Sequence, residues 1–212
     1  MNLPEPFRLI WKALRGWWDG WLSLLLYGLV WLLCWFTIVL GPPATFGFFF
    51  AVRAWIDEKE TRWNLYYQMG KKYFLASWGW FLANLLVFFI VFANNVFYES
   101  LGGGLGSFLK AIAMVIGFLW VAVQFYALPY FVLLEKKNLL IAWKNGLFTI
   151  MASPLFSLGM WIALALLISL HVVIMPLFFG GPGLIVLLSS MAVEDRIETF
   201  GIRERDSHQE TN

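Results

Sequence analysis

Long apolar blocks separated by short polar stretches make up most of the chain. The block Trp21–Leu40 contains no charged side chain and has the length of about 20 residues that a helix needs to cross a bilayer. Tyr73–Ala93, Phe108–Leu134 and Pro154–Pro176 are apolar blocks of similar length, and Lys110 is the one charged residue among them. Because Trp21–Leu40 is longer than the apolar region of a signal peptide, we expect it to be a retained span. The pattern predicts an all-α protein, a polytopic transmembrane helical bundle.

Two shorter apolar blocks, 41–56 and 182–193, each follow a break rich in glycine and proline. We expect structural turns at Gly41, Pro42 and Pro43 and again at Pro182. The first block alone is short for a crossing, but a helix from Pro43 to Trp63 would rise about 31 Å, enough to span. If both blocks cross, the bundle has six spans with two Gly/Pro-turned hairpins. Whether they cross fully stays open.

The rest of the chain follows from this plan. Asn94–Ser107 is expected to be the loop between two spans, and Pro129 should kink the helix that contains it. We expect one transmembrane bundle over 1–203 and a disordered polar tail over 204–212.

Residues 5–19 form an amphipathic pattern. Arg8, Lys12, Arg15 and Asp19 recur on one helical stripe, and aromatic and aliphatic side chains fall elsewhere. The stretch is typical of a helix lying in the lipid headgroup region, and a helix packed on the protein's own loops is the alternative. Residues 135–151 give a second amphipathic helix of the same kind.

Basic residues indicate the orientation. In the six-span arrangement, all but Lys110 of the 15 lysines and arginines share one side of the membrane. If 41–56 does not cross, Arg8, Lys12 and Arg15 move to the side of Lys110. Basic residues near span ends are retained in the cytoplasm. We therefore expect a multi-pass protein of the bacterial cytoplasmic (inner) membrane, with N-terminus and C-terminus cytoplasmic.

Composition supports a lipid environment. The chain of 212 residues is 61% hydrophobic and 13% charged, with a mean hydropathy of +0.74, whereas soluble domains carry about 25% charge. The net charge of +2 is too small to indicate a nucleic-acid partner. The single cysteine, Cys34, excludes an internal disulfide.

Few polar residues lie inside the predicted spans. Asn84, Gln124 and His171 are the candidates for an intramembrane polar network, because polar groups in lipid are costly and often functional. They could line a path for a polar solute, or each could be an ordinary hydrogen bond between helices.

A basic and aromatic surface is expected at the inner leaflet. Its basic residues include Arg53, Lys71, Lys72 and Lys144, with tryptophans near the same boundary. The surface could dock a partner, or it could simply anchor the bundle to anionic lipid.

Catalysis is not expected. The predicted spans hold no acidic pair for acid–base chemistry, and the chain has no H-E-x-x-H, G-x-S-x-G or Walker motif. We predict a non-enzyme with no cofactor and no metal ion.

Several short stretches resemble a known family. They are Gly41-Pro42-Pro43-Ala44-Thr45 leading to Ala51-Val52-Arg53-Ala54-Trp55, then Leu128-Pro129-Tyr130, then Lys144-Asn145-Gly146 running to Ser153-Pro154. In these stretches the chain resembles the YesL-like family of bacterial membrane proteins (domain of unknown function 624). The resemblance implies a small polytopic membrane protein whose gene accompanies carbohydrate uptake and polysaccharide degradation, and it assigns no site residues.

Two functions follow as hypotheses. The first is a non-enzymatic accessory component linked to carbohydrate uptake or utilisation, with the lipid bilayer and a membrane transport complex as its partners. The alternative is a small-solute transporter or channel with a polar path through the bundle. Substrate and oligomeric state stay open.

Overall fold

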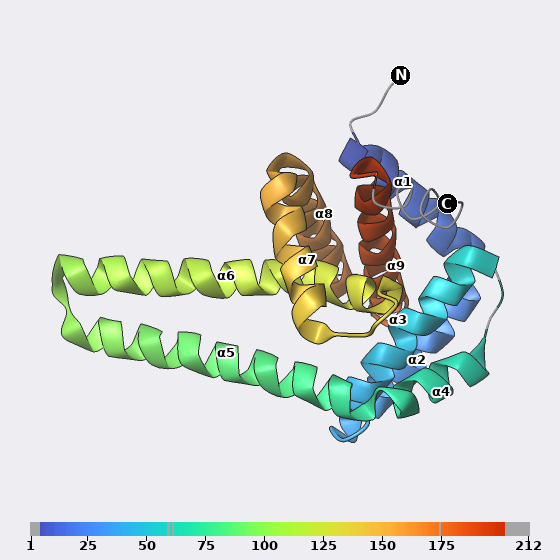
Figure 1. Cartoon of the computed structure of the whole chain (residues 1–212), viewed down its shortest axis with the longest axis horizontal. Helices are drawn as coiled ribbons and strands as arrows, with labels where there is room; N and C mark the ends of the chain where they lie inside the picture. Colours follow the sequence, from blue (N-terminus) through green and yellow to red (C-terminus); the bar gives the residue numbers. More distant parts are fainter. Residues whose placement is uncertain (1–4, 59, 61, 174, 202–212) are drawn as a thin grey trace, which may run out of the picture.

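The computed structural model describes residues 5–58, 60, 62–173 and 175–201, without the side chains of 171–180. Over these residues all regular structure is helical, as the sequence predicted (Figure 1). The helices in this part of the chain are α1 (Glu5–Asp19), α2 (Trp21–Phe36), α3 (Gly41–Glu58), α4 (Trp63–Lys72), α5 (Phe74–Leu101), α6 (Gly103–Leu133), α7 (Leu139–Ala152), α8 (Pro154–Val173) and α9 (Met175–Thr199).

The helices form a body and a projecting hairpin. Helices α5 and α6 run side by side and extend away from the rest of the molecule, joined at a tip (Figure 1). The body contains α1–α4 and α7–α9, packed around the near ends of the hairpin. Helices α7, α8 and α9 run roughly crosswise to the hairpin in this view.

Helices α3 and α9 form the centre of the body. Phe46, Phe48 and Val52 of α3 and Leu187 and Val193 of α9 are almost completely buried. Helix α9 packs against α1, α2, α3, α6 and α8. The two short blocks whose crossing the sequence left open are therefore the core helices of the body.

The first proline turn lies elsewhere than predicted. The chain reverses over residues 37–40, where Ile38 has a φ of 59°, and Gly41, Pro42 and Pro43 already belong to the first turn of α3. The prediction of a turn at Gly41–Pro43 is thus wrong by a few residues. Prolines are tolerated in a first helical turn because the backbone N–H groups there have no intrahelical acceptor.

Glycine at position 41 has a packing reason. A Cβ built there would lie 2.6 Å from the Trp35 ring, so only glycine lets α2 and α3 meet this closely. Helix α3 ends at Glu58, which makes the predicted continuous helix from Pro43 to Trp63 wrong.

The predicted turn at Pro182 is also wrong. Helix α9 begins at Met175, well before the predicted turn, and continues through residues 180–183. A Cβ on Gly183 would lie 2.9 Å from the carbonyl oxygen of Leu24. This glycine therefore allows close contact between α9 and α2, a use that sequence alone cannot tell from a turn.

The loop predicted over Asn94–Ser107 is helical except at its centre. Gly102 and Gly103 reverse the chain with φ values of 62° and 68°, a region that glycine adopts without steric cost. The side chains of Asn94 and Asn95 donate to the carbonyl oxygens of Ile90 and Val91 at 2.7 and 2.8 Å. Their amide N–H groups thus bond to the helix backbone, and α5 continues for about two more turns to Leu101.

Two helices, α5 and α6, are each long and apolar enough to cross a membrane. Two bent pairs pass the same test together: α1 with α2, bent by 88°, and α7 with the part of α8 up to Leu170, bent by 106°. The described residues thus contain two to four candidate membrane-spanning helices. The six-span bundle stays a prediction.

Helix α1 confirms the predicted helix over 5–19 and has a buried face and an exposed face. Leu9, Ala13 and Gly16 are buried against the body, whereas Trp11 and Trp18 are about 70% exposed. The helix therefore packs on the protein and presents tryptophans outward, and its position in the headgroup region stays a prediction.

Candidate functional site

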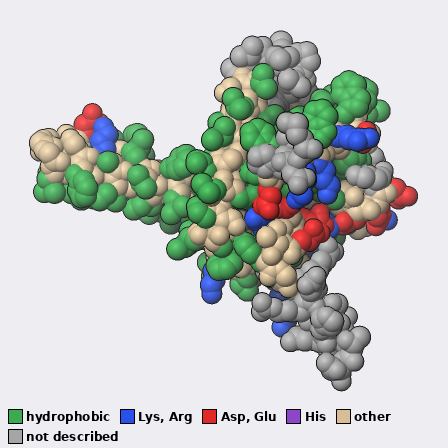
Figure 2. All heavy atoms as spheres, turned by 90° about the horizontal axis from the view of Figure 1, so that it is seen from above, with side chains coloured by type: hydrophobic (Ala, Val, Ile, Leu, Met, Phe, Trp, Pro, Cys, Tyr) green, Lys and Arg blue, Asp and Glu red, His purple; other side chains and the backbone are tan. Residues whose placement is uncertain are grey.

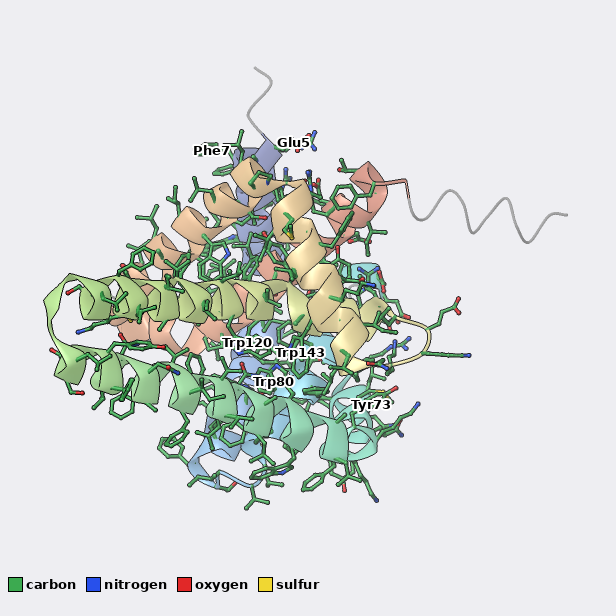
Figure 3. All side chains as sticks on the ribbon, turned by 60° about the vertical axis from the view of Figure 1, so that its left-hand side comes forward. Glu5, Phe7, Tyr73, Trp80, Trp120 and Trp143 are labelled. Carbon is green, nitrogen blue, oxygen red and sulfur yellow. The ribbon has the colours of Figure 1, made fainter. Side chains whose placement is uncertain are left out.

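The amides of Asn84 and Gln124 belong to one hydrogen-bonded network where α5, α6 and α7 meet. Asn84 Oδ1 accepts from the indole N–H of Trp120 at 3.0 Å, and its Nδ2 donates to the carbonyl oxygen of Trp80 at 2.8 Å. Gln124 Oε1 accepts from the indoles of Trp80 and Trp143 at 2.9 and 3.2 Å. Trp80 thus links the two amides, and Figure 3 shows the three tryptophans gathered at this junction.

This network acts as a clamp between three helices. Each amide oxygen accepts a hydrogen bond from at least one indole N–H group. The centres of the Trp120 and Trp143 rings lie 5.4 Å apart. Gln124 Nε2 is buried without a hydrogen-bond partner. We refer to Trp80, Asn84, Trp120, Gln124 and Trp143 as the indole–amide clamp.

The sequence predicted part of this clamp. It identified Asn84 and Gln124 but did not connect them with the tryptophans, of which only Trp143 was assigned to the membrane boundary. The signal was present, because Trp80 precedes Asn84 by four residues and Trp120 precedes Gln124 by four, a spacing that places side chains on one helix face. The third candidate, His171, lies at the end of α8, where side chains are outside the described residues.

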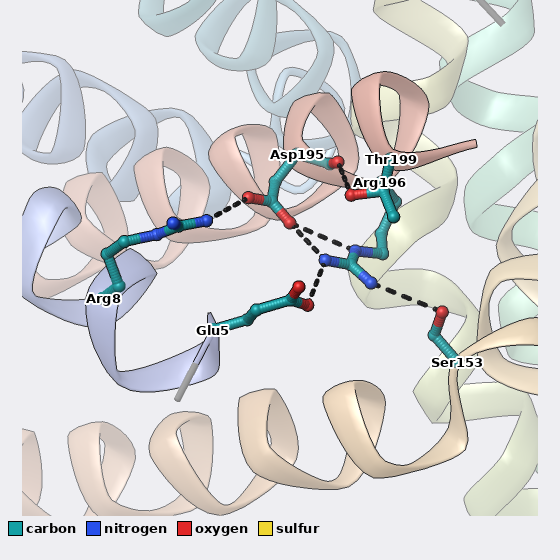
Figure 4. A network of polar contacts seen from close by, with 6 residues as sticks. All are labelled: Glu5, Arg8, Ser153, Asp195, Arg196 and Thr199. Carbon is teal, nitrogen blue, oxygen red and sulfur yellow. Dashed lines mark hydrogen bonds and ion pairs between the residues drawn. The ribbon is translucent and has the colours of Figure 1, made fainter. Parts of the chain in front are cut away.

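A second polar site joins the two ends of the chain (Figure 4). Arg196 of α9 is 4% exposed. Its guanidinium donates to Asp195 Oδ2 at 2.5 Å and to Glu5 Oε2 at 2.7 Å, and lies 3.9 Å from the centre of the Phe156 ring. Arg8 lies 3.7 Å from the other oxygen of Asp195. These contacts fix α1 to α9, and we call this group the α1–α9 ion cluster.

Sequence reasoning missed the α1–α9 ion cluster because its partners are 191 residues apart. The basic candidate Arg53 also forms ion pairs within the protein. It forms a bidentate pair with Asp57 at 2.6 and 3.0 Å and contacts Glu194 at 3.2 Å. Its side chain is 13% exposed, so Arg53 ties α3 to α9 and offers little to a lipid surface.

The remaining basic candidates are exposed. Lys71 and Lys72 lie in the last turn of α4, and Lys144 lies on α7. Lys72 sits 5.3 Å from the centre of the Tyr73 ring. Lys137, in the connection between α6 and α7, donates to the carbonyl oxygens of Val132 and Leu134.

Burial, with a smaller contribution from Lys72, lowers the pKa of the Lys137 ammonium. The basic residues of the predicted surface thus fall into two groups. Lys71, Lys72 and Lys144 are exposed, whereas Arg53 and Lys137 bond to other groups of the protein.

An apolar cavity of about 450 Å³ lies between α2, α3 and α4. Its lining includes Val30 and Cys34 of α2, Ala44 of α3, and Tyr66 and Lys71 of α4. Burial raises the pKa of Tyr66, which keeps its hydroxyl neutral. The cavity is lined almost wholly by carbon, and Lys71 is its charged lining residue.

Metal chemistry finds no support in the parts of the chain with described placement, where His, Cys, Asp and Glu form no group of three or more suited to a metal ion. Asp195 and Glu5, the carboxylates nearest to each other in the α1–α9 ion cluster, are engaged by arginine.

Comparisons with known proteins give no relative. No protein-family model, no curated protein and no solved structure matches this chain.

Proposed function

We propose that this protein is a non-enzymatic accessory component of the bacterial cytoplasmic membrane, linked to carbohydrate uptake or utilisation. The observation that carries the accessory role is the indole–amide clamp. A carrier needs amides that face a passing solute, whereas both amide oxygens here are held by indole N–H groups. The link to carbohydrate comes only from the resemblance to the YesL-like family.

Charge placement supports an orientation for this role. On the face in Figure 2, hydrophobic side chains cover the projecting hairpin, one cluster of charge lies near its tip, and the other charged side chains gather on the body. The tip cluster contains the Lys110–Glu99 pair at 3.1 Å. Because basic residues favour the cytoplasm, we place the body at the cytoplasmic leaflet and the tip on the opposite side.

The number of crossings distinguishes two versions of this orientation. In the version we favour, only α5 and α6 cross fully, because α7, α8 and α9 run crosswise to them (Figure 1). In the six-span version, the turn over residues 37–40 reaches the outer surface together with the hairpin tip. Ile38, which is exposed, therefore lies on opposite sides in the two versions.

Cysteine labelling tests this difference. In a Cys34→Ser background, single cysteines are placed at Ile38 and at Ser100, and intact cells are treated with a membrane-impermeant maleimide. We expect labelling at Ser100 and none at Ile38 until the cells are opened. Labelling of Ile38→Cys in intact cells would establish the six-span version, and failure at Ser100→Cys would overturn the orientation itself.

Purification tests the accessory role. The protein is isolated in mild detergent, and any proteins that come with it in fixed stoichiometry are identified. A permease in a constant ratio supports the proposal. Sugar movement by the protein reconstituted alone would overturn it in favour of the alternative, a small-solute transporter or channel.

Substitution separates the same two functions in cells. If the protein is an accessory component, Gln124→Leu and His171→Phe should leave its activity in cells nearly unchanged when the variants are present at the same level. Complete loss of activity with normal expression would favour a polar path. Expression must be measured because Gln124→Leu leaves the indoles of Trp80 and Trp143 without their acceptor.

A further inference from the structure

The cavity between α2, α3 and α4 is open enough to admit a ligand from the protein surface. The helices that line the cavity are separated at the cavity itself. Beside it, α3 and α4 approach each other closely. A Cβ on Gly70 of α4 would lie 3.0 Å from the carbonyl oxygen of Pro43, so α3 and α4 are already in contact there. The cavity of about 450 Å³ lies beside this contact.

The surroundings of the cavity are suited to an amphiphile. Tyr67 and Phe74 line it and are exposed, and Leu75, next to them in sequence, is 84% exposed. Exposed apolar side chains around an apolar cavity favour contact with lipid chains over contact with water.

The charge at the cavity is positive and unpaired. Lys71 lines the cavity and has no acidic side chain within ion-pairing distance among the described residues. The next residue, Lys72, adds a second exposed positive charge in the same helical turn. A ligand that fills the cavity with hydrocarbon and places a negative group at Lys71 would satisfy both features.

We propose that this cavity binds an anionic membrane lipid, with acyl-chain carbon between α2 and α4 and the headgroup phosphate at Lys71. The site does not depend on the accessory role, since it uses neither the indole–amide clamp nor the α1–α9 ion cluster. It gives the basic surface one specific lipid position in addition to general attraction to the leaflet.

Cys34 provides a direct probe of occupancy. It is the single cysteine of the chain, it lines the cavity and it is half-buried. A lipid chain in the cavity will shield its thiol from alkylation. The purified full-length protein in detergent is mixed with phosphatidylglycerol or with phosphatidylcholine at the same mole fraction, and the rate of N-ethylmaleimide addition is followed by intact mass.

We expect phosphatidylglycerol to slow alkylation about fivefold more than phosphatidylcholine, the effect of one lysine on an anionic lipid. Lys71→Gln should remove this preference. Lys144→Gln is the matched control, because it removes an exposed charge outside the cavity lining, and it should keep the preference. Equal protection by both lipids in the unmodified protein, or equal loss in both variants, would overturn the proposal.

Two further experiments separate the contribution of the lipid headgroup from that of its acyl chains. Glycerol phosphate, which has the charge without the acyl chains, should not protect Cys34, and protection by it would contradict the role of the hydrocarbon. Val30→Phe fills the cavity from the α2 side, so lipid-dependent protection should disappear. If protection by phosphatidylglycerol persists in Val30→Phe, the lipid binds elsewhere and the proposal fails.

Discussion

The body and the α5–α6 hairpin achieve stability in different ways. In the body, large side chains such as Tyr27, Phe46 and Phe48 are almost fully buried between several helices, and arginines join helices distant in sequence. Beyond the indole–amide clamp, the hairpin has only its two helices, and apolar side chains such as Phe89 and Val115 are about two-thirds exposed.

The difference indicates which part is suited to lipid as its solvent. Contact between α5 and α6 depends on small residues: a Cβ on Gly117 would lie 3.1 Å from Val91 Cγ1. Much of the outward surface is left uncovered by the described residues. Such a surface is unfavourable in water and suited to a bilayer, where helix packing relies on close backbone approach.

The largest effect is expected from Arg196→Met in the body. Removing the guanidinium takes away the cation that Asp195 and Glu5 share, which should lower the free energy of unfolding by about 3–5 kcal/mol. The change is read from unfolding by SDS in mixed micelles.

Arg8→Met is its control. Arg8 is 67% exposed and 3.7 Å from Asp195, so its loss should cost about 0–1 kcal/mol. Equal destabilisation by both variants would contradict a buried cluster that depends on Arg196.

The next effect is expected in the hairpin. Phe89→Arg puts a charge on the exposed apolar surface and should disfavour insertion by about 2.5–3.5 kcal/mol. Ser100→Arg, near the polar tip, should insert normally. The measurement is the fraction of protein that resists carbonate extraction from membranes, and equal insertion of the two variants would exclude lipid contact around Phe89.

A smaller effect tests the contact within the hairpin. Gly117→Leu forces a side chain into Val91 and should cost about 1–3 kcal/mol. Gly79→Leu is matched, because a Cβ at Gly79 meets nothing within 4 Å. If Gly117→Leu unfolds in SDS at the same midpoint as Gly79→Leu, the two helices are not in the close contact described.

The smallest effect concerns the pH dependence of the body. Since burial lowers the pKa of Lys137, the unfolded chain binds more protons than the folded protein between the two pKa values, and stability rises with pH there. The penalty is fully present below the folded pKa and disappears as pH passes the unfolded pKa.

Lys137→Met removes this group, so its stability should rise less steeply with pH in the alkaline range than that of the unmodified protein. Unfolding midpoints at a series of pH values measure the two slopes. A steeper rise in Lys137→Met would show that the lysine is not disfavoured in its charged form.

Hydrophobic blocks and the amphipathic period of residues 5–19 were sufficient to predict helices, because local spacing alone decides which faces are apolar. The same reasoning found Asn84 and Gln124, since a polar residue in an apolar run is conspicuous. It wrongly predicted chain reversals at Pro42 and Pro182. Proline also occurs in the first turn of a helix, and glycine also allows two helices to approach closely, so neither residue by itself indicates a reversal.

Tertiary structure alone decided which helices form the core and which residues meet. The partnership of Glu5 with Arg196, the sharing of Gln124 between two indoles and the cavity beside Lys71 all join segments far apart in the chain. A local pattern fixes which residues share a helix face, but it carries no information on which other helix that face will meet. In this protein, composition and spacing determined the helices and their apolar surfaces, and packing determined which polar side chains of the described residues meet between them.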